Sequence, residues 1–216
     1  MTSRAMVIVG GGSSSRFGAD KLTIEVAGRP LIAHTIAAVR EHVDDCVLVC
    51  HPDRVEAIAS LGLDVVITPG GATRTLSELA GLAVIDAATQ LIGIHDAARP
   101  LVDGELIESL FVTAAEYGGA VPIVGADELM VHRRTMRPVA GLGRAQTPQV
   151  FNGPVLLNAY ARAAESGFEA RDTAEVVERF SDLVIAAVPG DHANVKVTYR
   201  EDIAAVATRL RDTSRT

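Results

Sequence analysis

The strongest constraint on the fold is an alternation of short apolar runs with longer amphipathic stretches. Each apolar run is short enough to be a buried strand; the runs occupy residues 5–9, 46–50, 65–68, 91–96 and 119–124. Apolar residues recur at helical spacing in the stretches between them, at 30–42, 54–61, 78–88 and 103–117. Strands that alternate with helices pair in parallel and carry helices on both faces. We therefore predict an α/β fold with a mostly parallel sheet, whose ligands bind beyond the carboxyl ends of the strands.

The alternation breaks after Gly125, where β-prone pieces surround a basic turn. We predict an extended β-arm at about 126–146, leaving the body of a single domain that spans residues 1–216. An isolated hairpin is marginally stable, so we expect the arm to pack on a second copy in a homodimer. Further elements are expected along the rest of the chain: helices at about 154–165 and 173–180, strands at 184–188 and 193–198, and a closing helix that begins at a capping box of Thr198 and Glu201.

Composition excludes several classes of function. The net charge of −7 and the aromatic content of 4% argue against nucleic-acid binding, which needs basic surface and stacking rings. Cys46 and Cys50 would lie roughly 13 Å apart on one strand, too far for a disulfide, so we expect buried thiols in a reducing compartment. We find no secretory signal and no apolar stretch of membrane-spanning length, and expect a cytoplasmic protein.

The first apolar run leads into an unusual loop, "VIVGGGSSSRFGADK", at residues 7–21. Glycines let backbone N–H groups approach a phosphate closely, and Arg16 and Lys21 add positive charge. The loop fits neither the dinucleotide fingerprint, because Ser15 stands where the third glycine belongs, nor the phosphate-loop motif. The alternative interpretation is a plain glycine turn with two solvated cations.

Five segments carry a resemblance to a known family. The stretch from Gly11 to Lys21 resembles the G-G-x-S-x-R-x-G-x-D-K signature of the nucleotidyltransferase superfamily. Four later segments narrow it to the 2-C-methyl-D-erythritol 4-phosphate cytidylyltransferases. "GGATRTLSELAGL" (70–82) resembles that family's G-G-x-x-R-x-x-S-V segment, "HDAARP" (95–100) and "TPQVF" (147–151) match its motifs, and "NVKVTYREDI" (194–203) resembles its N-I-K-[IV]-T-x-P-E-D-[LM] ending. The matches are collinear over residues 5–210.

The resemblance implies a Rossmann-like sheet, CTP and a polyol phosphate as substrates, and Mg²⁺ as cofactor. It assigns transition-state stabilisation to Arg16, Lys21 and Lys196. It places the nucleotide at Gly10, Gly11, Gly12, Gly71, Arg74, Ser77, Asp96 and Ala97. The acceptor would meet Asp96, Arg99, Thr147, Lys196 and Arg137, and Asp96 would also be the metal ligand.

Each of these residues also has a structural interpretation. Asp96 could be a turn or N-cap aspartate, and Arg99 a surface ion-pair partner. Ser77 could simply lie in the first turn of a helix that begins at a T-x-x-E capping box of Thr75 and Glu78. The alternation of Lys196 with two valines is typical of a solvated lysine. We interpret two further polar residues as structural: His95, because an anionic acceptor needs no base, and Asp172.

Three departures from the family pattern affect which acceptor and which nucleobase the protein would recognise. Ala72 replaces an aspartate beside the cytosine, Glu128 replaces a phosphate-binding threonine in the arm, and Val139 stands where the arm carries an arginine. Arg137, Arg133 or Arg134 could supply that arginine, or the cluster could be a solvated basic turn. Two alternatives therefore stay open: a transferase for ribitol phosphate or another phosphate acceptor, and a nucleotide-binding protein without turnover. A dehydrogenase is the least favoured, since the third fingerprint glycine is absent.

Overall fold

A computed structural model describes residues 2–11, 21–126, 130–132, 136–138 and 142–213. The strands are β1 (Arg4–Gly10), β2 (Glu25–Val26), β3 (Arg29–Pro30), β4 (Asp45–Cys50), β5 (Val66–Pro69), β6 (Leu91–Asp96), β7 (Gly118–Gly125), β8 (Met130–His132), β9 (Met136–Pro138), β10 (Gly143–Ala145), β11 (Gln149–Asn152) and β12 (Val184–Pro189). The helices are α1 (Leu31–Arg40), the 3₁₀ turn η1 (Pro52–Arg54), α2 (Val55–Ala59), α3 (Arg74–Leu82), α4 (Gly104–Tyr117), α5 (Gly153–Ser166), α6 (Thr173–Phe180) and α7 (Asp202–Thr213).

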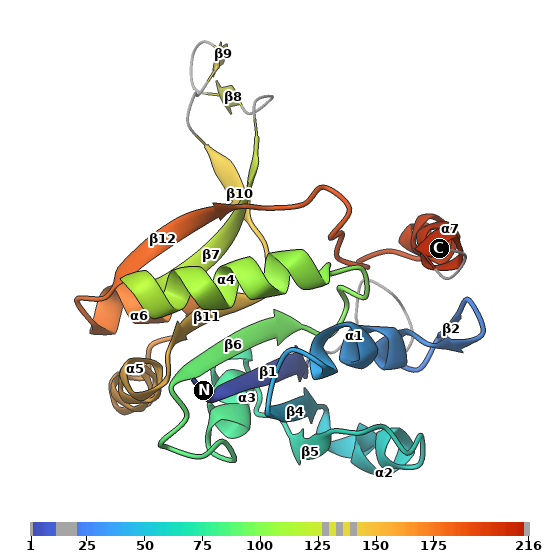
Figure 1. Cartoon of the computed structure of the whole chain (residues 1–216), viewed down its shortest axis with the longest axis horizontal. Coiled ribbons are helices and arrows are strands. Elements are labelled where there is room, and N and C mark those ends of the chain that lie inside the picture. The colour runs from blue at the N-terminus through green and yellow to red at the C-terminus, as the bar shows by residue number, and fades with distance from the viewer. Residues whose placement is uncertain (1, 12–20, 127–129, 133–135, 139–141, 214–216) are drawn as a thin grey trace.

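Eight strands form one mixed sheet in the order β10-β7-β11-β6-β1-β4-β5, with β12 also paired to β7 (Figure 1). The pairs β6–β1, β1–β4, β4–β5 and β12–β7 are parallel, as the strand and helix alternation predicts. Sequence reasoning missed β11, which lies antiparallel between β6 and β7. Only four residues long, β11 follows the arm directly, so no helical crossover marks it in the sequence.

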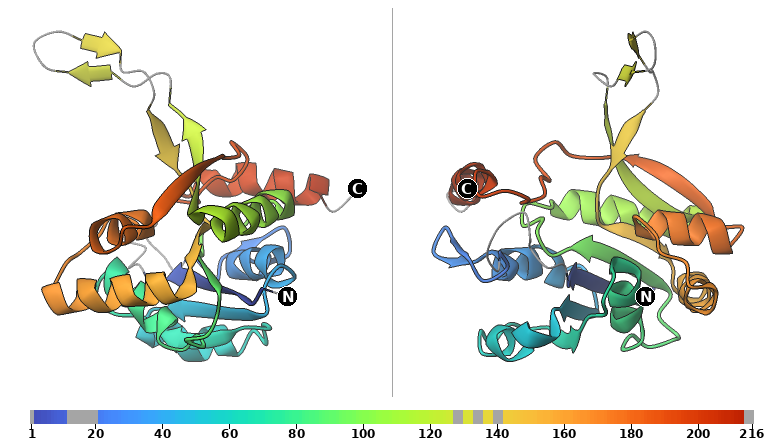
Figure 2. Two further views of the ribbon diagram at one scale, coloured as in Figure 1. Left: turned by 60° about the vertical axis from the view of Figure 1, so that its left-hand side comes forward. Right: turned by 180° about the vertical axis from the view of Figure 1, so that it is seen from behind.

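Helices cover both faces of the sheet (Figures 1 and 2). Side chains of a single strand pack against the helices on both faces. On β1, Met6 and Ile8 pack into one buried cluster with α1 and α4, while Ala5 and Val7 pack into another with α3, α5 and α6. A strand buried on both faces reads as a continuous apolar run, which explains why these strands were predictable. The predicted buried thiols are confirmed: Cys46 and Cys50 are both buried and neither forms a disulfide, and burial raises the pKa of Cys46 to about 12.

The predicted strand at 193–198 is wrong, because this segment runs as an irregular loop. The Val197 N–H donates to Ala98 O at 2.8 Å, while the Val195 N–H turns back to Ala193 O at 2.7 Å, so no ladder forms. The segment is nevertheless anchored. Val197 is fully buried in a third apolar cluster, which also contains Ala98 and α7 residues such as Val206.

Both predicted capping boxes are also wrong. The N-cap of α3 is Thr73, whose hydroxyl accepts from the Leu76 N–H at 3.2 Å, so the helix begins before Thr75 and ends at Leu82. At the start of α7 the capping carboxylate belongs to Asp202 rather than Glu201. It accepts from the backbone N–H groups of Thr198 and Tyr199 at 2.7 and 2.8 Å.

Residues on either side of the basic turn form an antiparallel ribbon that projects from the body (Figures 1 and 2). At its base, β10 pairs with β7 from Gly143 opposite Gly125 to Ala145 opposite Ile123. Farther out, β8 pairs with β9. None of the helices in the described part of the chain is long and apolar enough to span a bilayer.

Candidate active site

The candidate site lies where three neighbouring parallel strands end. In the register of β1, Val9 stands opposite Asp96 of β6, and Gly10 stands opposite Cys50 of β4. The glycine loop and the HDAARP segment therefore leave the sheet side by side. The motifs were predicted to meet at this edge because carboxyl ends of parallel strands coincide.

Side chains of other residues occupy the space beside the glycines at this edge, so a larger residue there would require them to move. A Cβ on Gly10 would lie 2.6 Å from Leu22 Cδ1, and one on Gly11 would lie 2.7 Å from Ser77 Oγ. Ser77 is equally close to the 70–71 turn, since a Cβ on Gly70 would be 2.9 Å from its hydroxyl. The structure thus brings together Gly11, Ser77 and the turn that contains Gly71, three of the positions predicted to hold the nucleotide.

Ser77 does lie in the first turns of a helix, as its structural interpretation proposes. Its hydroxyl donates back to Thr73 O at 2.8 Å and lies 3.2 Å from Gly71 O. Both main-chain polar groups of Ala97, also predicted to bind the nucleotide, have partners within the fold. Its N–H donates to Val9 O at 3.0 Å, and its carbonyl accepts from the Thr35 hydroxyl at 2.9 Å.

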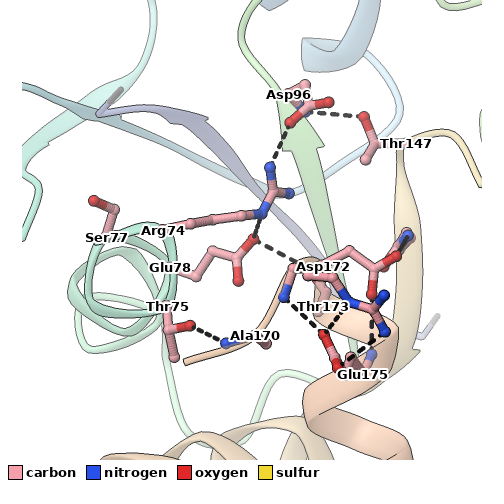
Figure 3. Close-up of polar contacts among 12 residues, drawn as sticks. Arg74, Thr75, Ser77, Glu78, Asp96, Thr147, Ala170, Asp172, Thr173 and Glu175 are labelled. Carbon is pink, nitrogen blue, oxygen red and sulfur yellow. Dashed lines mark hydrogen bonds and ion pairs between the residues drawn. The ribbon is translucent and has the colours of Figure 1, made fainter. Parts of the chain in front are cut away.

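Asp96, at the end of β6, is the centre of a charged cluster; Figure 3 shows its contacts with Arg74 and Thr147. Its side chain is nearly buried and meets three cations: Oδ1 lies 2.9 Å from Arg74 Nη1, and Oδ2 lies 3.2 Å from Arg99 Nε and 3.0 Å from Lys196 Nζ. Burial alone would raise the pKa of Asp96, but Lys196, Arg74 and Arg99 outweigh it and hold that pKa well below its usual range. Asp96 is therefore an anion that organises three cations predicted to belong to the site.

Lys196 is not the solvated lysine of its structural interpretation. A turn carries it back over Asp96: Gln146 Nε2 donates to Asp191 O at 2.7 Å, and Asn194 Nδ2 donates to Thr147 O at 2.8 Å. Lys21 reaches the same place, since its Nζ donates to Val197 O at 3.2 Å. The chain contains only two lysines among twenty basic residues, and the fold brings both to this edge.

His95 and Thr147 join the HDAARP and TPQ segments beneath Asp96. His95 Nε2 lies 3.1 Å from Arg99 O, which can only accept, so this nitrogen carries the proton and Nδ1 accepts from the Thr147 hydroxyl at 3.1 Å. The Thr147 oxygen in turn accepts from the Asp96 N–H at 3.0 Å. Burial lowers the pKa of His95 to about 4 despite the nearby Asp96 charge, so the imidazole is neutral at pH 7 and structural.

With this geometry established, we compared the chain with known proteins. A family model described as 2-C-methyl-D-erythritol 4-phosphate cytidylyltransferase matches residues 5–212. The chain belongs to this family. The predicted family, the α/β fold class and the class of enzyme, a cytidylyltransferase, are thereby confirmed.

Individual members of the cytidylyltransferase family match over nearly their whole length. The protein of that name from Thermobifida fusca is 36% identical over 231 residues, which cover 96% of this chain and 93% of that protein. The one from Cereibacter sphaeroides is 39% identical over 214 residues, covering 93% of each. The crystal structure of the Thermus thermophilus protein matches with a TM-score of 0.81 and 30% identity, over 95% of this chain and 98% of that one.

Other relatives are described as bifunctional IspD/IspF enzymes. The one from a Bradyrhizobium strain is 34% identical over 223 residues, which cover 97% of this chain but 56% of that protein. The chain thus spans about half the length of the bifunctional relatives that it matches.

Several positions that the cytidylyltransferase motifs single out lie outside the described residues, namely Gly12, Arg16, Glu128 and Val139. The backbone of Arg137 is part of β9, at the far end of the projecting ribbon (Figure 1). Within one chain this strand is remote from the sheet edge that carries Asp96 (Figure 1).

Sequence reasoning missed the partners that hold the site residues in place. Asp172 was interpreted as structural, and it is the N-cap of α6, accepting from the Glu175 N–H at 3.0 Å. Glu78 was assigned to a capping box, yet its carboxylate is completely buried and lies 2.8 Å from Arg74 Nε. The available signal was its place in the sequence: a glutamate in a helix stretch where the family pattern S-V has valine.

Proposed function

We propose that this chain transfers CMP from CTP to 2-C-methyl-D-erythritol 4-phosphate, a step in the non-mevalonate route to isoprenoid precursors. One observation carries the proposal for this family member: Gly10 and Gly11 follow β1 beside Asp96 at the end of β6, where three cations gather. Glycines at such an edge suit the close approach of a triphosphate to backbone N–H groups. Lys21, Arg99 and Lys196 suit the charge of the two phosphate-bearing substrates.

In the proposed reaction, an anionic oxygen of the acceptor phosphate attacks the α-phosphorus of CTP. A new P–O bond forms there, the bond from the α-phosphorus to the bridging oxygen breaks, and pyrophosphate leaves with the electron pair. No general base is needed, in keeping with a neutral, buried His95. Such transfers depend on positioning and charge stabilisation. We assign that stabilisation to Arg16, Lys21 and Lys196.

For the nucleotide, we propose that Gly10, Gly11 and Gly12 bind the phosphates through backbone groups. Gly71 and Ser77 would contact the cytosine, whose amino group is a donor that suits the Gly71 carbonyl. Because Ala72 offers no carboxylate to that amino group, we expect discrimination between CTP and UTP to rest on main-chain contacts.

For the acceptor, we propose that its phosphate meets Arg99 and Lys196 on the outer side of Asp96. Arg99 is well placed for this, since Nη1 is anchored to Asn194 O at 2.6 Å and Nε to Asp96. Thr147 takes a supporting part, because its hydroxyl is already engaged with His95 and with the Asp96 N–H. Arg137 would reach this phosphate from the arm of a second copy.

We propose a homodimer formed through the arm, which the remoteness of β9 from its own sheet edge supports. The test is a variant in which residues 127–141 are replaced by a short glycine-serine turn. We expect this variant to fold, to elute as a monomer where wild type elutes as a dimer, and to lose acceptor affinity. A monomeric wild type would contradict the dimer and leave the transferase proposal standing.

We also propose that Mg²⁺ accompanies CTP, but Asp96 does not fit a metal ligand in the arrangement described. Both of its carboxylate oxygens accept from cations, and the described residues contain no group of three or more His, Cys, Asp or Glu side chains that could hold a metal. Mg²⁺ is commonly held by substrate phosphates with one or two carboxylates. We therefore assign the ion to the triphosphate and route no step of the reaction through a protein ligand.

The decisive experiment measures pyrophosphate release with each nucleoside triphosphate against methylerythritol phosphate and ribitol phosphate. We expect release with CTP and methylerythritol phosphate. Release only with ribitol phosphate would show that the acceptor is ribitol phosphate and not methylerythritol phosphate. If CTP raises the melting temperature but no acceptor gives turnover, the chain is a nucleotide-binding protein and the transferase proposal is overturned.

The role of Lys21 has its own test. Because its charge matters most in the transition state, Lys21→Ala should lower kcat by about 10²-fold or more and change the Kd for CTP only a few-fold. The matched control is Arg40→Ala, which removes a cation paired with Asp64 at 2.9 Å away from this edge. Equal losses in kcat and CTP affinity for Lys21→Ala would contradict a transition-state role.

A further inference from the structure

Glu78 is a fully buried carboxylate that the proposed reaction does not use. It lies on α3 and contacts two other helices: Tyr160 Oη of α5 donates to Oε2, and Thr173 Oγ1 of α6 lies 3.3 Å from Oε1. Tyr160 and Thr173 are fully buried as well. Figure 3 shows this carboxylate between Arg74 and the start of α6.

A buried carboxylate at this position is costly. The desolvation of a charged group amounts to several kcal/mol unless hydrogen bonds and an opposite charge compensate it. The family segment quoted above ends in S-V, and a valine in place of Glu78 would need no partners. Here three side chains of α3, α5 and α6 are instead committed to the carboxylate, which indicates that its contacts serve something that valine would not.

Among the contacts of Glu78, the one with Arg74 connects it to the candidate active site. Arg74 Nε lies 2.8 Å from Glu78 Oε1, and Nη1 of the same guanidinium lies 2.9 Å from Asp96 Oδ1. The guanidinium therefore spans from a carboxylate in the core to the carboxylate at the sheet edge (Figure 3). Because the other oxygen of Asp96 meets Arg99 and Lys196, the orientation of Arg74 affects the arrangement of both.

The net charge of the cluster also supports a role for Glu78 in orienting Arg74. With Glu78 and Asp96 ionised, the cluster with Arg74, Arg99 and Lys196 carries one net positive charge, and with valine at position 78 it would carry two. The Arg74 guanidinium lies between two carboxylates, which neutralise more of its charge than Asp96 alone neutralises at Arg99. Without Glu78, Arg74 could turn away from Asp96 toward any anion in the site.

We propose that Glu78 is a positioning residue for the acceptor half of the site. It fixes the Arg74 guanidinium on Asp96, and so leaves Arg99 and Lys196 to meet the acceptor phosphate. Tyr160 and Thr173 hold the Glu78 carboxylate in place for this purpose. The inference rests on the proposed function for its effect on the acceptor, and on the geometry alone for its effect on Arg74.

The kinetic test uses Glu78→Val, Arg74→Ala and the double variant. We expect Glu78→Val to raise the KM for methylerythritol phosphate about tenfold, because the buried ion pair that holds the Arg74 guanidinium is lost. The KM for CTP should stay within about twofold. If Glu78 acts through Arg74, adding Glu78→Val to Arg74→Ala should change the acceptor KM no further. Full additivity of the two losses would overturn the proposal.

A second pair of variants separates positioning from stability. Glu78→Val leaves the Tyr160 hydroxyl without its acceptor, so we expect a lower melting temperature. Adding Tyr160→Phe removes that hydroxyl and should restore much of the melting temperature while the acceptor KM stays high. If the acceptor KM recovers together with stability, Glu78 is merely structural. The matched control is Glu108→Gln, at a carboxylate that binds Arg4 3.0 and 2.8 Å away on the other face of the sheet.

An NMR measurement tests the contact between Glu78 and Arg74 without relying on enzyme activity. The ¹⁵N–¹H signal of Arg74 Nε, assigned by its loss in Arg74→Lys, should shift in Glu78→Val and stay unchanged in Glu108→Gln. An unchanged Arg74 signal in Glu78→Val would overturn the proposal. Absence of transfer by wild-type enzyme would instead remove the proposed function, and the Arg74 signal would still report whether Glu78 orients the guanidinium.

Discussion

The neutral His95 predicts a specific dependence of stability on pH. Its pKa is lowered from 6.5 to about 4 by burial, whereas the same imidazole in the unfolded chain takes up a proton near 6.5. Between these values the unfolded state binds more protons, so the free energy of unfolding falls as the pH falls. At about 1.4 kcal/mol per pH unit, this one group costs wild type about 3 kcal/mol between pH 7 and pH 4, and no more below that.

The assay is urea unfolding of wild type and His95→Gln at several pH values. At pH 7 the variant should be less stable by about 1–3 kcal/mol, because the hydrogen bonds to Thr147 and the Arg99 carbonyl are disturbed. Toward pH 4 this difference in free energy of unfolding should shrink by about 3 kcal/mol, because wild type loses stability as its imidazole resists protonation, whereas the variant has no imidazole to protonate. The control is His51→Gln, which removes a half-exposed imidazole outside this hydrogen-bond network. A gap for His95→Gln that stays constant within about 1 kcal/mol would refute the reasoning.

Three further predictions concern the core and the charged cluster. Gly81→Ala should lower the free energy of unfolding by about 1–3 kcal/mol, because the new Cβ would lie 2.3 Å from Val7 Cγ1; a urea midpoint equal to wild type would contradict this. Phe151→Ala should cost about 3–5 kcal/mol in the same assay, because it empties a fully buried ring site. Asp96→Asn should lower the free energy of unfolding by about 2–3 kcal/mol. This is less than the loss of a fully buried ion pair would cost, because Lys196 is 38% exposed. Because the pKa of Asp96 lies below its usual 3.8, the difference in free energy of unfolding between wild type and Asp96→Asn should stay unchanged from pH 7 to 4. Urea titrations should find that it narrows only in stronger acid.

The sequence predicted those features that follow from local patterns. The five strands predicted from apolar runs form where expected as β1, β4, β5, β6 and β7, because burial on both faces leaves a continuous apolar signature. The meeting of Gly11, Ser77 and Asp96 at one edge also followed, since the ends of parallel strands coincide. Such inferences need only the order of strands and helices along the chain.

The sequence could not predict features that depend on distant partners. The strand β11 exists because β6 and β7 present free edges on both of its sides, not because its four residues have a strong preference for a strand. Lys196 looks solvated until Gln146 and Asn194 turn its loop back over Asp96. Glu78 has the local pattern of a helix cap, and besides Arg74 one turn away its partners Tyr160 and Thr173 lie 82 and 95 residues away, so no local rule identifies these two.

The path of the chain through β7, the arm and β11 has a consequence for how this enzyme can change over evolution. The arm leaves the sheet along β7 and returns as β10 and β11, both paired to β7, so the body holds its two ends side by side. A segment closed in this way can be lengthened, shortened or rewritten at its tip at little cost to the rest of the fold. Selectivity and subunit pairing, if they reside in the arm, can therefore diverge among relatives while the catalytic body is conserved.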